Sequence, residues 1–321
     1  MNQDAASQTE SSQAILKSNN QGNPTYRGRF APSPTGLLHI GSLISAVASY
    51  CQARHQRGVW LVRMEDLDQA REQAGAADEI LRTLDGFGLY WDESVVYQSQ
   101  RHPLYEFTLE ELRTLRAIYP CACSRKEIQQ GLNDDEPLRY PGTCRNGIMG
   151  GRRARALRLK TGDEVMTVVD QIQGQFQQQL NREVGDFVLK RADGFYAYQL
   201  AVVVDDAQQA INEVVRGADL LDNTPRQCYL QSILGFPQPL YAHVPIAVNS
   251  TGEKLSKQTR AMPIQTRDAL PLLWQALDFL GQAPPAITDF DHVYDLLTWA
   301  VDHWQLSGIP QQLKIPIPQA L

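Results

Sequence analysis

The sequence predicts an α/β protein with a parallel sheet, because segments typical of strands alternate with segments typical of helices. Strands are expected at three short apolar segments, 26–31, 59–64 and 95–97. Helices are expected between and after them, at 40–53, around 80–84 and at 104–118. Alternation of this kind gives a parallel sheet covered by helices on both faces. Ligands of such sheets bind beyond the carboxyl ends of the strands.

Polar segments follow the first two strands and mark that edge of the sheet. Prolines and Gly36 interrupt the chain between the first strand and the first helix. The first helix, 40–53, carries small and apolar residues on its buried side. The second strand is largely apolar and ends at the acidic run 65–68. We therefore expect the segments 32–42 and 65–68 to lie together beyond the strands.

The pattern changes after residue 120, which predicts five parts. They are a disordered tail at 1–25, the main α/β domain in two halves at 26–120 and 186–262, an inserted α+β subdomain at 121–185, and a short helical C-terminal region at 263–321. The second half is expected to contain strands at 186–190 and 196–204 joined by a hairpin turn at Asp193–Gly194, and further strands at 211–216 and 240–248. Two amphipathic helices are expected at 267–280 and 290–304.

Composition excludes several classes of protein. Of 321 residues, 43% are hydrophobic and 21% charged, as in soluble globular proteins. No apolar run approaches the ~18 residues of a membrane span, and the start of the chain lacks the features of a signal peptide. We therefore expect a cytoplasmic protein with no membrane association. A net charge of −6 argues against a broadly basic surface, although a local basic stripe can still bind RNA.

Two motifs far apart in the chain contain residues suited to ATP. The first, 29–42, places a histidine and two glycines around the start of a helix, where phosphate groups are bound favourably. The second, 254–258, is a lysine-rich loop whose charges can reach the β- and γ-phosphates. Each motif alone is compatible with an ordinary helix start or a solvated loop; together they predict ATP binding, with Mg²⁺. The expected catalytic residues are His39, Lys254 and Lys257, and the expected ATP contacts are His39, Gly41 and Lys257.

These motifs resemble the HIGH and KMSKS signatures of class I aminoacyl-tRNA synthetases. Four segments are similar to glutamyl-tRNA synthetases and their close relatives: Arg29–Gly36, Arg63–Asp68, Ala197–Asp206 and Val214–Leu221. The resemblance covers residues 26–262 and implies a class I synthetase, Rossmann-like parallel sheet. Nucleotidyl transfer of this kind needs positioning and charge stabilisation and no covalent protein intermediate.

The resemblance also implies a glutamate pocket formed by Arg29, Phe30, Ala31, Pro32, Ser33, Glu65, Tyr198 and Arg216. The chemistry agrees, because arginines bind carboxylates bidentately and Glu65 can pair with the α-ammonium. Each arginine by itself could equally form a surface ion pair. Asp205–Asp206 could cap a helix, and we do not assign them to the site. Val202 stands where glutamyl-tRNA synthetases usually have asparagine, which removes one polar contact.

Three of the five cysteines lie close together, at Cys121, Cys123 and Cys144. An odd number of cysteines without a secretory signal argues against a disulfide scaffold, and this spacing is typical of a structural Zn²⁺ site. The fourth ligand could be Tyr140, Asp134, Asp135, Glu136 or water, and three ordinary reduced cysteines are the alternative. The pattern Cys-x-Cys…Tyr-x₃-Cys resembles the zinc site of glutamyl-queuosine tRNA(Asp) synthetases, which implies the ligands Cys121, Cys123, Tyr140 and Cys144. Zinc would favour the tyrosinate, whose free pKa is about 10.

The segment after the lysine loop, 263–321, is shorter than the anticodon-binding domain of full glutamyl-tRNA synthetases. The chain therefore resembles their truncated relatives, the glutamyl-queuosine tRNA(Asp) synthetases. This implies tRNA-independent activation of glutamate to glutamyl-adenylate, and transfer to the queuosine base at the wobble position of tRNA(Asp). We expect a monomer that contacts the anticodon loop. The alternatives are a minimal glutamyl-tRNA synthetase charging the 3′ end, a nucleotidyltransferase of the same fold, and a non-catalytic RNA-binding paralogue.

Overall fold

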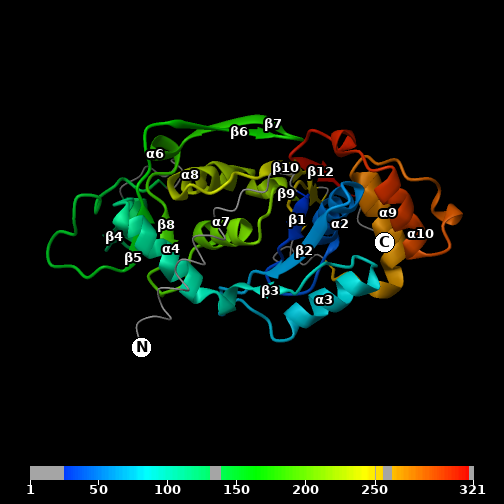
Figure 1. The fold of residues 1–321 in the computed structure, drawn as a ribbon, viewed down its shortest axis with the longest axis horizontal. Helices are drawn as coiled ribbons and strands as arrows, with labels where there is room; N and C mark the ends of the chain where they lie inside the picture. Colours follow the sequence, from blue (N-terminus) through cyan, green and yellow to red (C-terminus); the bar gives the residue numbers. More distant parts are fainter. Residues whose placement is uncertain (1–24, 131–138, 250, 256–261, 318–321) are drawn as a thin grey trace.

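The computed structural model describes residues 25–130, 139–249, 251–255 and 262–317 (Figure 1). Its strands are β1 (Arg27–Phe30), β2 (Val59–Met64), β3 (Val96–Tyr97), β4 (Ile118–Cys121), β5 (Ala156–Leu159), β6 (Val165–Asp170), β7 (Gly174–Gln179), β8 (Val188–Lys190), β9 (Glu213–Gly217), β10 (Leu240–Val244), β11 (Ile246–Val248) and β12 (Lys314–Pro316). Its α-helices are α2 (Ile40–His55), α3 (Ala76–Gly86), α4 (His102–Thr114), α5 (Arg125–Gln130), α6 (Leu180–Glu183), α7 (Tyr198–Gln208), α8 (Thr224–Leu234), α9 (Ala269–Phe279) and α10 (Val293–Asp302). The predicted tail lies outside the described residues apart from Thr25.

The predicted parallel sheet is present. Strands β1, β2 and β3 pair in parallel, and so do β9 and β10. β9 runs beside β1, where the Asn212 amide donates to the Arg27 carbonyl at 3.1 Å. The chain thus runs outward from β1 to β2 and β3 on one side, and from β9 to β10 on the other. The order of strands reverses between β1 and β9, and ligands of open α/β sheets bind at such a point.

Helices cover both faces of this sheet. Helix α2 packs on β1, β2 and β9, and α9 and α10 pack on α2 in turn (Figure 1). One large apolar core joins these elements and includes Trp60, Leu43 and Leu277. A second core lies among α4, α7, α8 and β8 and includes Leu200 and Val202. The predicted C-terminal helices are therefore confirmed, and they form a third layer over α2.

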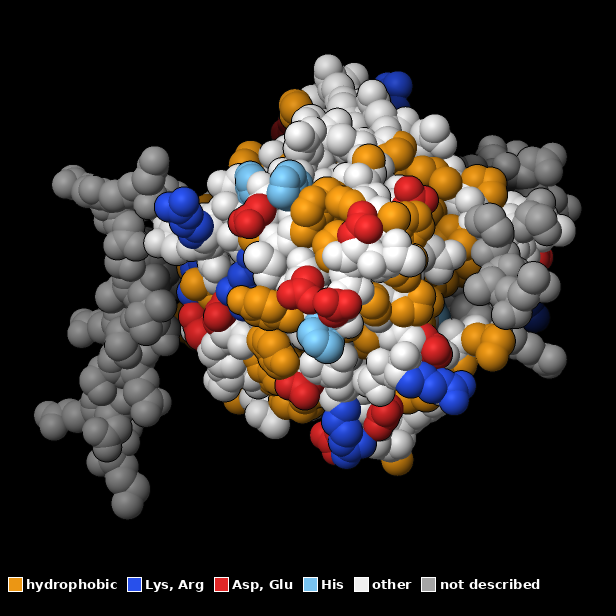
Figure 2. Space-filling view, turned by 90° about the vertical axis from the view of Figure 1, so that its right-hand side faces the viewer, with side chains coloured by type: hydrophobic (Ala, Val, Ile, Leu, Met, Phe, Trp, Pro, Cys, Tyr) orange, Lys and Arg blue, Asp and Glu red, His pale blue; other side chains and the backbone are white. Residues whose placement is uncertain are grey.

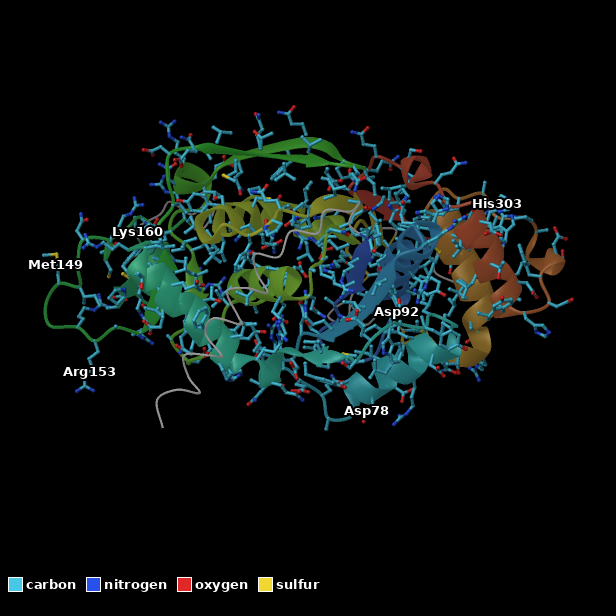
Figure 3. The ribbon with its side chains drawn as sticks, viewed as in Figure 1. Asp78, Asp92, Met149, Arg153, Lys160 and His303 are labelled. Atoms are coloured by element: carbon cyan, nitrogen blue, oxygen red, sulfur yellow. The ribbon has the colours of Figure 1, made fainter. Side chains whose placement is uncertain are left out.

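The region expected as an insertion, 121–185, contributes strands to two sheets. β4, β5 and β8 form a small antiparallel sheet at the end of the molecule opposite α9 and α10 (Figure 1). β6 pairs in parallel with β10, and β7 extends the main sheet as its antiparallel edge. Met149 and Arg153 extend outward from the loop beyond the small sheet (Figure 3), and Met149 is 83% exposed.

Three local expectations change. The helix expected over 104–118 ends at Thr114, because Arg116 adopts a left-handed conformation (φ +53°) and the Ala117 amide bonds back to Leu112. Ile118 then begins a strand. The apolar stretch 196–204 is mostly helix α7, and the strand expected at 240–248 is split by Pro245 into β10 and β11. A proline lacks the N–H that a continuous strand would need.

The face formed by α9 and α10 carries apolar, acidic and histidine side chains in close alternation (Figure 2). Tyr294 on α10 is 75% exposed there. Across the described ranges, no helix combines the length and apolar character that crossing a membrane requires.

Candidate active site

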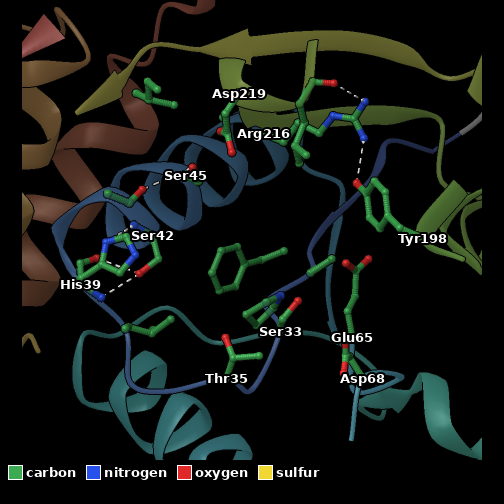
Figure 4. A pocket seen from close by; sticks show the side chains of 18 of the residues that line it. Ser33, Thr35, His39, Ser42, Ser45, Glu65, Asp68, Tyr198, Arg216 and Asp219 are labelled. Carbon is green, nitrogen blue, oxygen red and sulfur yellow. Dashed lines mark hydrogen bonds between the residues drawn. The ribbon is translucent and has the colours of Figure 1, made fainter. Parts of the chain in front are cut away.

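A pocket of about 620 Å³ lies beyond the carboxyl ends of β1, β2, β9 and β10. The two segments expected to meet there do so, since the Glu65 amide donates to the Pro32 carbonyl at 3.0 Å. Predicted site residues that line the pocket are Arg29, Phe30, Ala31, Pro32, Ser33, His39, Gly41, Glu65, Tyr198, Arg216 and Lys254. His39 lies at one end, and Tyr198, Arg216 and Glu65 lie at the other (Figure 4). Lys257 lies outside the described residues.

His39 is the N-cap of α2. Its Nδ1 accepts from the Ser42 amide at 3.3 Å, and the Ser42 hydroxyl oxygen accepts from the His39 amide at 2.8 Å. An imidazole that accepts at Nδ1 carries its proton on Nε2. The cap therefore fixes a ring that can donate a hydrogen bond from Nε2, next to the amides of a helix N-terminus that favour anions.

Gly41 brings the two predicted motifs together. A Cβ placed at Gly41 would lie 3.1 Å from His39 Cε1 and 3.2 Å from the carbonyl oxygen of Leu255, in the lysine loop. A side chain at this position would force the His39 ring or the loop backbone to shift by a few tenths of an ångström, so glycine favours this close approach. The Lys254 ammonium of the same loop pairs with the Asp219 carboxylate at the rim of the pocket.

Arg29 is held by Asp206, a residue that the sequence does not assign to the site. Its Nε and Nη2 donate to the two carboxylate oxygens of Asp206 at 3.1 and 3.4 Å. Arg63 Nη2 lies 2.8 Å from the same carboxylate. Burial opposes ionisation of Asp206, but Arg29 and Arg63 hold its pKa below the usual range. Asp205 and Asp206 lie near the end of α7, so the alternative of an N-terminal helix cap does not hold.

Glu65 is a nearly buried carboxyl at the end of β2. Its Oε1 is enclosed and has no hydrogen-bond partner among the described residues, and its nearest cation, Arg63 Nη2, is 3.6 Å away. Burial raises the pKa of Glu65 to about 7, against the opposing effects of Arg63 and Arg29. A carboxyl in this state gains from a cation that enters the pocket.

Arg216, in contrast to Arg29, is held by neutral acceptors. Its Nε donates to His243 Nε2 at 3.0 Å, and its Nη2 donates to Thr224 Oγ1 at 2.9 Å. Its Nη1 donates to the Tyr198 hydroxyl at 3.3 Å (Figure 4). Among the residues that the structure describes, none provides it with a carboxylate partner. Arg216 as a whole residue is 5% exposed, and its guanidinium retains an uncompensated positive charge facing the pocket.

The remaining predicted contacts shape the wall of the pocket. Phe30, the last residue of β1, packs parallel to Trp60 with ring centroids 6.4 Å apart. This contact holds the end of β1 in place at the wall of the pocket. Gly36 has a φ of +144°, which favours glycine at the turn before α2. Val202 is 1% exposed and belongs to the second core, away from the residues that line the pocket.

The cysteine cluster can hold a metal. The Sγ atoms of Cys121, Cys123 and Cys144 lie within 4.8 Å of one another, and those of Cys123 and Cys144 are 3.6 Å apart. The Tyr140 hydroxyl lies 3.3 Å from Cys121 Sγ and 3.7 Å from Cys123 Sγ. A tetrahedral Zn²⁺ with Zn–S of about 2.3 Å places its sulfurs roughly 3.8 Å apart. Three thiols and a hydroxyl therefore have the spacing of one tetrahedral site.

Arg158 lies against this cluster. Its Nε donates to Cys121 Sγ at 3.3 Å, and its guanidinium carbon lies 3.8 Å from the centre of the Tyr140 ring. Burial raises the pKa of the Tyr140 hydroxyl, so ionisation of this side chain needs a nearby cation. Asp134, Asp135 and Glu136, the other candidates for the fourth ligand, lie outside the described residues.

Comparison with known proteins identifies the class. The family model described as the catalytic domain of class I tRNA synthetases (E and Q) matches residues 25–281. Among solved structures, a glutamate-tRNA synthetase from Elizabethkingia anophelis superposes with a TM-score of 0.73 over 92% of this chain and 68% of its own, at 22% identity. That similarity shows the fold alone.

Curated relatives named glutamyl-Q tRNA(Asp) synthetase are much more similar. The one from Dechloromonas aromatica is 54% identical over 92% of this chain and 99% of its own length. Those from Chromobacterium violaceum and Pseudomonas putida (strain GB-1) are 54% and 48% identical, over 92% of this chain and 99% and 98% of their own. The chain therefore belongs to the glutamyl-Q tRNA(Asp) synthetase family, within the class I tRNA synthetases, and is a ligase.

Proposed function

We propose that the protein activates glutamate with ATP, forming glutamyl-adenylate, and transfers glutamate to the queuosine base at the wobble position of tRNA(Asp). One observation carries the amino acid assignment. The pocket holds an uncompensated cation, Arg216, and at the same end a carboxyl, Glu65, whose Oε1 has no hydrogen-bond partner within the described part of the chain (Figure 4). Glutamate offers the complementary pair, a side-chain carboxylate and an α-ammonium.

In this proposal the side-chain carboxylate of glutamate binds Arg216 and the Tyr198 hydroxyl. Burial raises the pKa of Tyr198, which keeps its proton available for donation. The α-ammonium binds Glu65, and its charge draws the raised pKa of Glu65 back down. Arg29 contributes less charge to the substrate than the sequence suggested, because Asp206 already neutralises it.

The α-carboxylate then lies toward the His39 end of the pocket, where ATP binds. A carboxylate oxygen attacks the α-phosphorus, and the bond to the bridging oxygen breaks as pyrophosphate leaves with the electron pair. His39 donates from Nε2 to the phosphate oxygens, and the start of α2 adds its amides. Lys254 and Lys257 neutralise the β- and γ-phosphates. To do so, Lys254 leaves its ion pair with Asp219 and binds a phosphate oxygen instead. Mg²⁺ bound with ATP supplies further charge neutralisation.

In the second step a hydroxyl of the queuosine cis-diol attacks the glutamyl carbonyl carbon. The hydroxyl loses its proton, an ester bond forms, and AMP leaves with the bridging oxygen. The cis-diol resembles the terminal ribose of tRNA, so one catalytic edge can serve a modified base. The names of the relatives support this acceptor.

We further propose that Cys121, Cys123, Cys144 and Tyr140 hold a structural Zn²⁺. The spacing of the sulfur and hydroxyl atoms supports this ligand set. The site lies in the small sheet and its adjoining loops, apart from the residues that line the pocket. Its expected contribution is to fold and orientation of this part of the chain.

Glutamate-dependent exchange of pyrophosphate into ATP, measured without tRNA, tests the proposed activation step. Exchange is expected with glutamate and to be strongly reduced with glutamine, which lacks the charge, and with aspartate, which is one methylene shorter. Equal exchange with glutamine, or none with glutamate, would contradict the assignment of this pocket.

A further inference from the structure

We infer that Asp170 and His243 form a positioning relay, which presents Arg216 as an uncompensated cation to the side-chain carboxylate of the substrate. This inference rests on the proposed function. His243 Nδ1 lies 2.6 Å from Asp170 Oδ2, and His243 Nε2 accepts from Arg216 Nε at 3.0 Å. Asp170 and His243 are 3% and 0% exposed, so the relay is closed to solvent.

The backbone fixes which oxygen of Asp170 faces the imidazole. Its Oδ1 accepts from three amides, those of Ile172, Gln173 and His243, at 2.9–3.1 Å. Only Oδ2 remains for His243 Nδ1. That nitrogen therefore carries the proton, and Nε2 presents a lone pair to Arg216. The relay thus selects one tautomer of a neutral imidazole.

The charge on the imidazole is consistent with this. Burial lowers the pKa of His243, and Arg216 adds to that effect against the opposing influence of Asp170. Tyr241, whose ring stacks on His243 at 6.2 Å, is also buried in a neutral form. A neutral ring can accept from Arg216, whereas an imidazolium would repel it.

A neutral acceptor explains the difference between the two arginines of the pocket. A carboxylate holds Arg29 and neutralises it, while an imidazole holds Arg216 and leaves its charge for a ligand. The anion of the relay, Asp170, stays one residue farther from the substrate. This arrangement favours a charged side chain over its neutral amide and assigns to Asp170 and His243 a part in choosing glutamate over glutamine.

The substitution Asp170→Asn tests the relay with almost no change in shape. Three amides require the Asn oxygen to stay in the Oδ1 position, so its NH₂ group faces His243 Nδ1. The ring must then accept at Nδ1 and carry its proton on Nε2, which points at Arg216 Nε–H. A change of tautomer caused by the same substitution underlies the loss of activity in a well-known catalytic triad.

The measurement is steady-state pyrophosphate exchange without tRNA. Asp170→Asn is expected to raise the KM for glutamate about 10- to 100-fold, the range for a lost hydrogen bond to a charged group, and to leave the KM for ATP near the wild-type value. It should also reduce the preference for glutamate over glutamine. Asp186→Asn is a matched control, because Asp186 is equally buried but bonds to Tyr119 and Thr161 in the small sheet. It is expected to leave both KM values unchanged.

An unchanged KM for glutamate in Asp170→Asn overturns the relay. If that variant does not fold, His243→Gln and His243→Leu replace it. Glutamine keeps a neutral acceptor, so it should retain tighter glutamate binding than leucine, and equal values overturn the inference. Imidazole ¹⁵N NMR separates this inference from the proposed function. Wild-type protein should carry the His243 proton on Nδ1 and Asp170→Asn on Nε2, whichever amino acid is activated.

Discussion

Glu65→Gln is predicted to stabilise the protein at neutral and alkaline pH while it weakens glutamate activation. Glu65 is buried and poorly paired, and its pKa rises from 4.5 to about 7 on folding. At about 1.4 kcal/mol for each pH unit, ionising this carboxyl costs the folded protein about 3 kcal/mol. Glutamine has the same shape and removes that cost, because it has no charge to bury.

Because folding raises the pKa of Glu65, its effect on stability changes between pH 4.5 and pH 7. Between pH 4.5 and 7 the folded protein holds a proton on Glu65 that the unfolded chain has released, so the contribution of Glu65 to stability falls as the pH rises. The loss is complete above about pH 7. The difference in unfolding free energy between Glu65→Gln and wild type should therefore grow by about 3 kcal/mol from pH 4.5 to pH 8.

Urea denaturation of both proteins across this pH range provides the measurement, with pyrophosphate exchange as the readout of function. The KM for glutamate should rise in Glu65→Gln, because the α-ammonium loses its anion. In wild type, the same KM should rise as the pH falls below about 7, because Glu65 becomes protonated. If the stability difference between Glu65→Gln and wild type does not change with pH, Glu65 is not a buried, poorly paired carboxyl with a raised pKa.

Three further predictions concern other parts of the site. Arg216→Gln should lower kcat/KM for glutamate in pyrophosphate exchange by at least about 100-fold, since it removes a buried charge partner, and a smaller effect than that of Arg29→Gln would contradict the charge argument. Gly41→Ala should raise the KM for ATP up to roughly 10-fold and leave the KM for glutamate unchanged, because its methyl group would displace the Leu255 backbone. An unchanged KM for ATP would contradict the contact between the two motifs. Metal analysis should find one zinc per chain. Cys144→Ser should lose the zinc and have a lower melting temperature, whereas the control Cys51→Ala should keep the zinc. If wild-type protein without metal has unchanged stability, a structural zinc is excluded.

Much of the fold could be predicted because local signals and tertiary structure agree. The first two strands and α2 follow directly from apolar segments interrupted by prolines and glycines. The stretch 196–204 could not be assigned by periodicity, because its valines are buried on all sides and such a run fits a strand or a helix equally well. The left-handed turn at Arg116 has no signal, since arginine rarely adopts that conformation.

The residue types of the site were predictable, but the distribution of charge among them was not. Arg29 and Arg216 carry the same group, and only the fold shows that Asp206 neutralises one and His243 leaves the other charged. Isolated polar residues inside apolar strands are a signal that sequence reasoning could have used. Arg63 in β2 and His243 in β10 are both of this kind, and both are buried contacts that position the pocket.

The position of glutamate on the acceptor tests the central claim most directly. Radiolabelled glutamate, ATP and queuosine-containing tRNA(Asp) are incubated with the protein, and the product is digested with nuclease to separate the anticodon fragment from the 3′ terminus. Label is expected on the anticodon fragment, and none on tRNA(Asp) that lacks queuosine. Label on the 3′-terminal adenosine would contradict it and would indicate a minimal glutamyl-tRNA synthetase.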